Sequence, residues 1–110
     1  MLIIQKELNR ETLLTEVTFQ GHAGTAKDGT DVCAMASTVF YTFLNALRYG
    51  HGLFGYQANP DKPEEDCLIR FDEENPACYW FGKMAMIGFK MLAEKYPENI
   101  RVLEDDKDEK

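Results

Sequence analysis

A histidine and a cysteine lie close together near the start of the sequence. His22 stands in a glycine-flanked stretch, residues 21–24, and Cys33 follows a short polar turn at residues 27–30. A base on a mobile loop and a nucleophilic thiol are the two groups that a cysteine hydrolase uses. A turn of this length can return the loop to the cysteine. We therefore hypothesise a nucleophilic site made of His22 and Cys33, although closeness in sequence leaves their contact open.

A helix is predicted to begin just before this cysteine. Apolar side chains recur at spacings of three and four over residues 32–47, which predicts one buried helical stripe. Thr30 or Asp31 can cap the first turn, and the pattern stops before Gly50. Cys33 would then lie in the first turn, where the helix dipole favours a thiolate over a thiol. The same turn offers backbone N–H groups that could stabilise an oxyanion.

The other reactive side chains have structural interpretations. A cysteine beside an apolar stripe is typical of an inert core residue, which remains an alternative for Cys33. We interpret Cys67 and Cys78 as core residues. His51 follows the predicted end of the first helix, where a cation complements the dipole, so a capping role is favoured over catalysis. The three cysteines and two histidines have no metal-ligand spacing, and no metal or cofactor is expected.

Composition indicates one small globular domain. The chain has 110 residues, 45% of them hydrophobic, and no apolar run approaches the length needed to cross a bilayer. No secretory signal is visible at the N-terminus, so we expect a cytoplasmic protein. A net charge of −7 argues against direct nucleic-acid binding and is compatible with a basic protein as partner. We assign residues 1–103 to the domain and residues 104–110 to an acidic, disordered tail.

The remaining patterns predict five strands and a second helix. The strands are expected at Leu2–Glu7, Leu13–Gln20, Leu53–Ala58, Cys67–Asp72 and Ile100–Leu103, the first two forming a hairpin. The second helix starts with Asn75 as cap and Pro76 at its first position and runs to about Tyr96. Its predicted buried face comprises Ala77, Phe81, Met84, Ala85, Gly88, Met91 and Leu92. Gly88 suggests a close approach to another helix. The order predicts a two-layer α+β domain, with a mixed, mostly antiparallel sheet and both helices on one face.

The motifs resemble those of the Prp family, the ribosomal-processing cysteine proteases of bacteria. Members carry Gly-His-Ala, a glycine-containing loop, and then Asp-(Ile)-Val-Cys-Ala-x-x-Ser, which match residues 21–23 and 31–37 here. Residues 95–102 look like the family's junction between helix and final strand. The spacing from Asp31 to Cys33 is one residue shorter than in many members. The resemblance covers the whole chain.

The resemblance implies a homodimeric α+β protease with a Cys-His dyad, carried onto Cys33 and His22. Such proteases remove an N-terminal extension from a large-subunit ribosomal protein. Gly21, Asp31 and Ser37 would bind substrate or support the site. Asp31 could cap the helix or orient His22, and the Ser37 hydroxyl could bind substrate or its own helix. The alternative function is a non-catalytic dimeric adaptor for ribosomal or other basic proteins, with the same fold and an unreactive cysteine.

Overall fold

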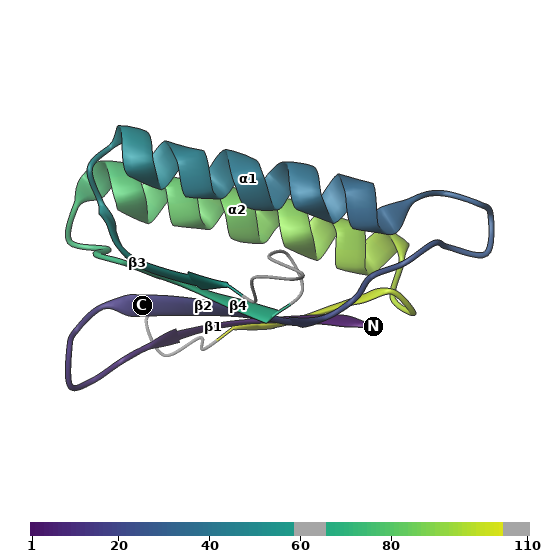
Figure 1. The fold of residues 1–110 in the computed structure, drawn as a ribbon, viewed down its shortest axis with the longest axis horizontal. Helices are drawn as coiled ribbons and strands as arrows, with labels where there is room; N and C mark the ends of the chain where they lie inside the picture. Colours follow the sequence, from purple (N-terminus) through teal and green to yellow (C-terminus); the bar gives the residue numbers. More distant parts are fainter. Residues whose placement is uncertain (59–65, 105–110) are drawn as a thin grey trace.

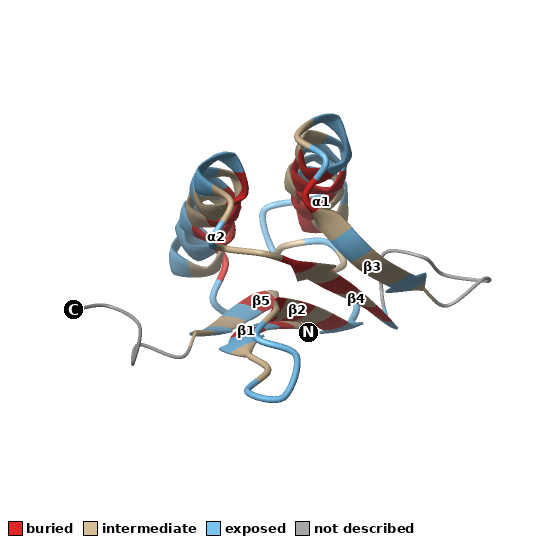
Figure 2. Cartoon of the chain, turned by 90° about the vertical axis from the view of Figure 1, so that its left-hand side faces the viewer, coloured by how far each residue is buried: buried red, intermediate tan, exposed pale blue. Residues whose placement is uncertain are grey.

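The computed structural model describes residues 1–58 and 66–104 and has two layers (Figure 1). A five-stranded sheet forms one layer, and two helices lie side by side on one of its faces (Figure 2). The elements in chain order are β1 (Leu2–Leu8), β2 (Thr15–Gly21), α1 (Val32–Tyr49), β3 (Leu53–Ala58), β4 (Asp66–Phe71), α2 (Pro76–Lys95) and β5 (Ile100–Glu104). The predicted α+β class, element order and arrangement of the helices are confirmed.

The sheet has the strand order β3-β4-β2-β1-β5. All neighbouring pairs are antiparallel except β1 and β5, which makes the sheet mixed. The predicted hairpin of β1 and β2 is confirmed, but β2 starts at Thr15 rather than Leu13. Leu13 has a left-handed backbone (φ 62°) and donates its N–H to the Asn9 carbonyl at 2.7 Å, so it belongs to the connecting turn. Both ladders of the central strand β2 begin at Thr15, which pairs with Leu8 of β1 and with Phe71 of β4.

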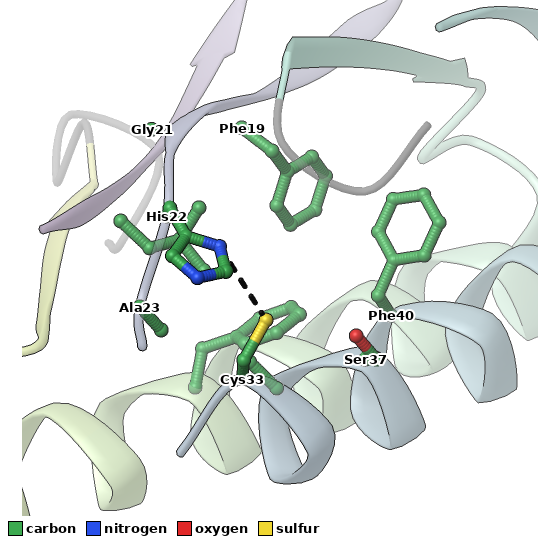
Figure 3. A pocket seen from close by; sticks show the side chains of 10 residues that line it. Phe19, Gly21, His22, Ala23, Cys33, Ser37 and Phe40 are labelled. Carbon is green, nitrogen blue, oxygen red and sulfur yellow. Dashed lines mark hydrogen bonds between the residues drawn. The ribbon is translucent and has the colours of Figure 1, made fainter. Parts of the chain in front are cut away.

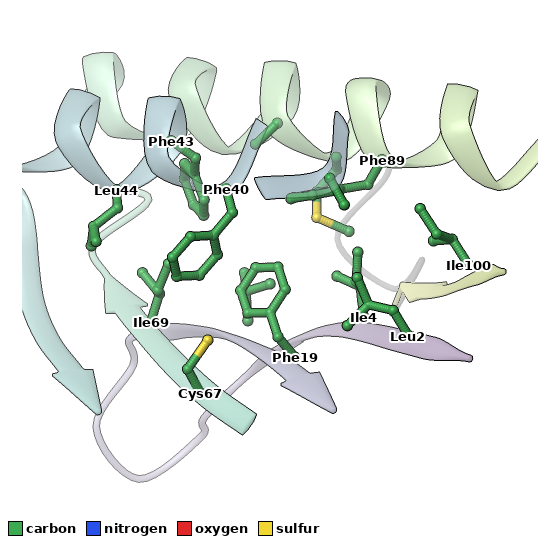
Figure 4. Close-up of a cluster of buried hydrophobic side chains, with 14 of the residues drawn as sticks. Leu2, Ile4, Phe19, Phe40, Phe43, Leu44, Cys67, Ile69, Phe89 and Ile100 are labelled. Atoms are coloured by element: carbon green, nitrogen blue, oxygen red, sulfur yellow. The ribbon is translucent and has the colours of Figure 1, made fainter. Parts of the chain in front are cut away.

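Alternate side chains of the strands face the helices and form the core (Figure 4). Phe19 of β2 lies at its centre, with ring centroids 5.0 Å from Phe40 of α1 and 5.5 Å from Phe89 of α2. Both contacts are edge-on, the geometry that aromatic pairs prefer. This packing ties the end of β2 to both helices, close to the loop that carries His22.

The predicted buried face of α2 is right at Ala85 and wrong at Ala77, Met84 and Met91, which are exposed; its other members are half-buried. The buried residues of α2 are Cys78, Gly82, Ala85, Met86 and Phe89, whereas Met84 and Met91 are 69% and 65% exposed. The helix is apolar around most of its circumference, so periodicity did not single out the inward stripe. Gly82 helps to set the rotation, because a Cβ there would come within 2.8 Å of the Phe71 ring.

The expected close approach at Gly88 is confirmed. A Cβ at this position would lie 3.3 Å from Val39 of α1.

Some expectations concern the ends and loops of the chain. Glu104, which we assigned to the acidic tail, is the last residue of β5 and pairs with Lys6 and Lys90. Residues 105–110 lie outside the described residues. The composition of residues 59–66 predicts a loop; residues 59–65 also lie outside the described residues, and Asp66 begins β4. Within the described part of the chain, no helix is long and apolar enough to cross a membrane.

Candidate active site

The loop between β2 and α1 brings the predicted histidine to the start of the helix. His22 directly follows β2, and Cys33 is the second residue of α1. The loop closes on itself through a bridge between Thr25 and Asp31. In addition, the Cys33 N–H donates to the Gly24 carbonyl at 3.1 Å. Gly24 adopts a positive φ of 73°, which permits this reversal of the chain.

The two side chains meet. The Cys33 Sγ lies 3.7 Å from the His22 Nδ1, within the range of a hydrogen bond to sulfur (Figure 3). With a neutral pair the thiol donates to the imidazole, and with a charged pair the imidazolium donates to the thiolate. Cys33 is half-buried and His22 is exposed, so solvent and a peptide can reach both. The contact that the sequence left open is therefore present.

A small pocket adjoins this pair (Figure 3). Its volume is about 10 Å³, roughly the space for one water molecule. It is lined by Leu2, Phe19, Gly21, His22, Ala23, Cys33, Ala36, Ser37, Phe40 and Phe89. The pocket gives the thiol a largely apolar surrounding, but in this conformation it has no room for a substrate side chain.

The Ser37 hydroxyl lines the same pocket, one helical turn after Cys33. It makes no hydrogen bond with any of the described residues. Its neighbours behave differently, because Thr38 donates to the Ala34 carbonyl at 3.0 Å and Thr42 to the Thr38 carbonyl at 2.7 Å. The alternative in which Ser37 bonds back to its own helix is therefore not what the structure shows, and its hydroxyl can meet a ligand.

The first-turn amides of α1 are already engaged. The Cys33 N–H bonds to the loop, the Ala34 N–H donates to the Asp31 Oδ1 at 3.0 Å, and the Met35 N–H donates to the Asp31 carbonyl at 3.4 Å. In this conformation the loop and the cap use these three amides, so none of the three is available to the oxyanion that first-turn N–H groups were expected to stabilise. The Asp31 carboxylate serves as the N-cap of α1.

Gly21 has a positional role at the end of β2. Its φ is 91°, and a Cβ there would lie 2.3 Å from the Met1 carbonyl oxygen. Only glycine fits this combination of positive φ and close backbone contact. Since Gly21 directly precedes His22, the crowded strand end determines where the histidine leaves the sheet.

Asn99 is a site residue that the sequence did not reveal. It lies just before β5, and its Nδ2 donates to the Ala23 carbonyl at 2.8 Å and to the Thr25 carbonyl at 3.3 Å. Both carbonyls belong to the loop directly after His22. These two hydrogen bonds therefore hold the loop after His22, although Asn99 lies near the other end of the sequence. The only signal in the sequence was its place in the stretch 95–102, which does not disclose its partners.

Comparison with known proteins identifies the family. The profile described as cysteine protease Prp matches residues 1–101. The chain belongs to the Prp family of cysteine proteases. No match was found among curated proteins.

Solved structures have the same fold. The chain is similar to the essential ribosomal processing protease Prp from Staphylococcus aureus in complex with a covalently linked product peptide, at 25% identity and a TM-score of 0.78. The match covers 96% of this chain and all of the other. A complex of that protease with a substrate peptide matches at 24% identity and a TM-score of 0.75 over the same shares. The Streptococcus mutans protein SMU.848 matches at 21% identity and a TM-score of 0.70, over 94% of this chain and 93% of that one.

The other histidine and cysteines of this Prp family member lie away from the pair. His51 follows the far end of α1, where its N–H donates to the Arg48 carbonyl at 3.2 Å. Cys67 and Cys78 are buried, as expected of core residues. Burial raises the pKa of the Cys78 thiol, and the nearby Asp72 carboxylate adds to the rise. No group of three or more potential metal ligands occurs within residues 1–58 and 66–104.

Proposed function

We propose that this chain is an endopeptidase in which Cys33 is the nucleophile and His22 is its proton carrier. Its substrate would be a large-subunit ribosomal protein, from which it removes an N-terminal extension. The observation that carries the proposal is the 3.7 Å contact between the two side chains in a member of a cysteine protease family. The similarity to a ribosomal processing protease with a covalently linked peptide supports the choice of substrate.

The chemistry follows from the two side chains. His22 takes the thiol proton, and the Cys33 thiolate attacks the scissile carbonyl carbon, forming a C–S bond. His22 then returns the proton to the leaving amine as the peptide bond breaks, and water hydrolyses the thioester that remains. The Ser37 hydroxyl would donate to the oxyanion, because it lines the pocket and is not engaged by the described residues.

The charge of the chain suits a basic substrate. Ribosomal proteins that bind RNA are rich in lysine and arginine, and this chain carries a net charge of −7. Long-range attraction would speed their encounter, and added salt would slow it.

The test is to incubate the purified chain with the extended ribosomal proteins of its host and to read new N-termini by mass spectrometry. The wild type should cut one protein at one site. Cys33→Ala and His22→Ala should each abolish cleavage while circular dichroism shows an intact fold. Cys78→Ala is the matched control and should still cut. An extended host protein that stays whole with folded wild type, or one that Cys33→Ala still cuts, would favour the adaptor instead.

A homodimer is also proposed. Trp80, Met84, Ile87 and Met91 form an exposed apolar stripe along α2, each more than half exposed. A second copy of the chain could cover this stripe across a twofold axis. Sedimentation at tens of micromolar, an order typical of modest interfaces, should show a dimer. Met84→Glu should give a monomer, and a wild type that is monomeric at this concentration would contradict the proposal.

A further inference from the structure

We propose that the outer face of α1 carries a substrate groove that continues from the pocket beside Cys33. The groove would hold an uncharged stretch of the substrate that lies several residues from the scissile bond. This inference rests on the proposed protease function and adds the place where the substrate sequence is read.

The groove runs along α1 and is open to solvent. Its volume is about 930 Å³, and its lining residues are Ser37, Thr38, Tyr41, Thr42, Asn45, Ala46, Tyr49 and Phe81. The residues of α1 form two adjacent rows at four-residue spacing, as expected along one helix face. Phe81 of α2 also lines the groove. Ser37 lines both this groove and the pocket of Cys33 and His22, so the two spaces adjoin at this side chain.

The pocket and the groove differ in size, so the reaction and the recognition of substrate side chains would take place in different spaces. The pocket beside Cys33 holds about 10 Å³ and cannot take a side chain in this conformation, whereas the groove has room for several. From Ser37 to Tyr49 the helix rises about 18 Å at 1.5 Å per residue. An extended peptide covers that length with about five residues. A peptide that reacts at Cys33 and follows α1 would therefore fill the groove with residues about three to eight positions from the cut.

The lining predicts the character of those residues. None of the lining residues is charged, and the single charged residue of α1 is Arg48. Tyr41, Tyr49 and Phe81 offer ring faces for apolar or aromatic side chains. The hydroxyls of Thr38 and Thr42 donate into their own helix, so their oxygens remain acceptors for peptide N–H groups. The lining therefore suits an uncharged stretch of the substrate.

The experiment uses synthetic peptides that span the cleavage site of the host ribosomal protein. A fluorescent parent peptide extends at least about eight residues on each side of the cut. Shorter peptides end within about two residues of the cut on one side or the other. Binding to Cys33→Ala is followed by fluorescence anisotropy, and kcat/KM is measured with the active enzyme.

Shortening one side should weaken binding about tenfold or more, and shortening the other side should have little effect. Tyr49→Ala and Asn45→Arg in the Cys33→Ala background should weaken binding of the long peptide and leave the short one unchanged. Phe54→Ala is the matched control, because Phe54 is an exposed aromatic residue of β3 outside the groove, and it should bind both peptides normally.

Each other result has one meaning. If the wild type cuts the peptides but neither peptide length nor the groove variants change binding, the groove proposal fails and the proposed protease function is retained. If Tyr49→Ala turns a dimer into a monomer, this face binds a second copy and the groove proposal fails. If the wild type neither cuts nor binds any of the peptides, the proposed function fails and the groove with it.

Discussion

The two helices of this protein begin in similar ways and treat their cysteines very differently. α1 starts after the cap Asp31 with Cys33 in its first turn, and α2 starts after the cap Asn75 with Cys78 in its first turn. Cys33 is half-buried, lines a pocket and contacts His22. Cys78 is fully buried, and a Cβ at Gly52 would fall within 1.8 Å of its Sγ.

The difference between the two cysteines shows that a position at a helix start is not enough to make a thiol nucleophilic. Both thiols lie near the same kind of dipole end, so the dipole alone does not select a nucleophile. A glycine-containing loop brings a base to Cys33, whereas Gly50 and Gly52, in the turn between α1 and β3, lie against Cys78. Burial raises the pKa of the Cys78 thiol and the nearby Asp72 carboxylate adds to it, which keeps this thiol neutral. Access and a partner therefore decide between a reactive and an inert cysteine.

The largest expected contrast is in alkylation. At neutral pH, iodoacetamide should modify Cys33 on the order of a hundredfold faster than Cys78, because the buried thiol reacts only when the fold opens. Peptide mapping by mass spectrometry would measure both rates in one sample. His22→Ala should slow Cys33 and leave Cys78 unchanged. Equal alkylation rates for Cys33 and Cys78 would contradict the prediction that only Cys33 is reactive.

The loop that completes the Cys33 site should depend on Asn99. Asn99→Ala removes two hydrogen bonds to the loop carbonyls after His22, and we expect kcat to fall about 10- to 100-fold through misplacement of the base. KM should change little, which separates positioning from lost substrate binding. Asn99→Asp keeps the shape but lacks the donor and should behave similarly. Wild-type kcat in both variants would show that the loop holds without these bonds.

The two caps offer a smaller, paired comparison. Asp31→Ala and Asn75→Ala should each lower the free energy of unfolding by about 1 kcal/mol, since each removes a side-chain acceptor for first-turn N–H groups. Urea denaturation would measure both. Asp31→Asn keeps an acceptor and should retain stability and protease activity. If it keeps stability but loses activity, the charge of Asp31 orients His22 and the cap is not its whole role.

The smallest effect concerns Cys78 and pH. Its pKa in the folded protein is raised above the ordinary value of 9.0, so its contribution to stability is complete below pH 9 and is lost as the pH rises toward the folded pKa. The free energy of unfolding of the wild type should therefore fall faster above pH 9 than that of Cys78→Ala. Parallel curves from pH 7 to 10 would contradict this. At pH 7 the titration of this thiol should contribute no slope.

Local hydrogen bonding and periodicity made much of the fold predictable from sequence. The caps Asp31 and Asn75, the helix stop near Gly50 and the strand alternations act over a few residues, so their patterns can be read directly. The hairpin of β1 and β2 followed because only a short polar connection separates them. The exact first residue of β2 could not be predicted, because the left-handed backbone of Leu13 has no clear sequence signal.

What the sequence by itself determined is the set of chemical groups and the elements that carry them: a histidine after a strand, a cysteine at a helix start, and an α+β order. The tertiary structure alone decided which groups meet. Cys78 is buried against Gly52, and Asn99 bonds to the histidine loop, although the residues of each pair are distant in sequence. The inward stripe of α2 was selected from a helix that is apolar around most of its circumference. Local patterns carry no information about such contacts, because packing of the whole core selects them.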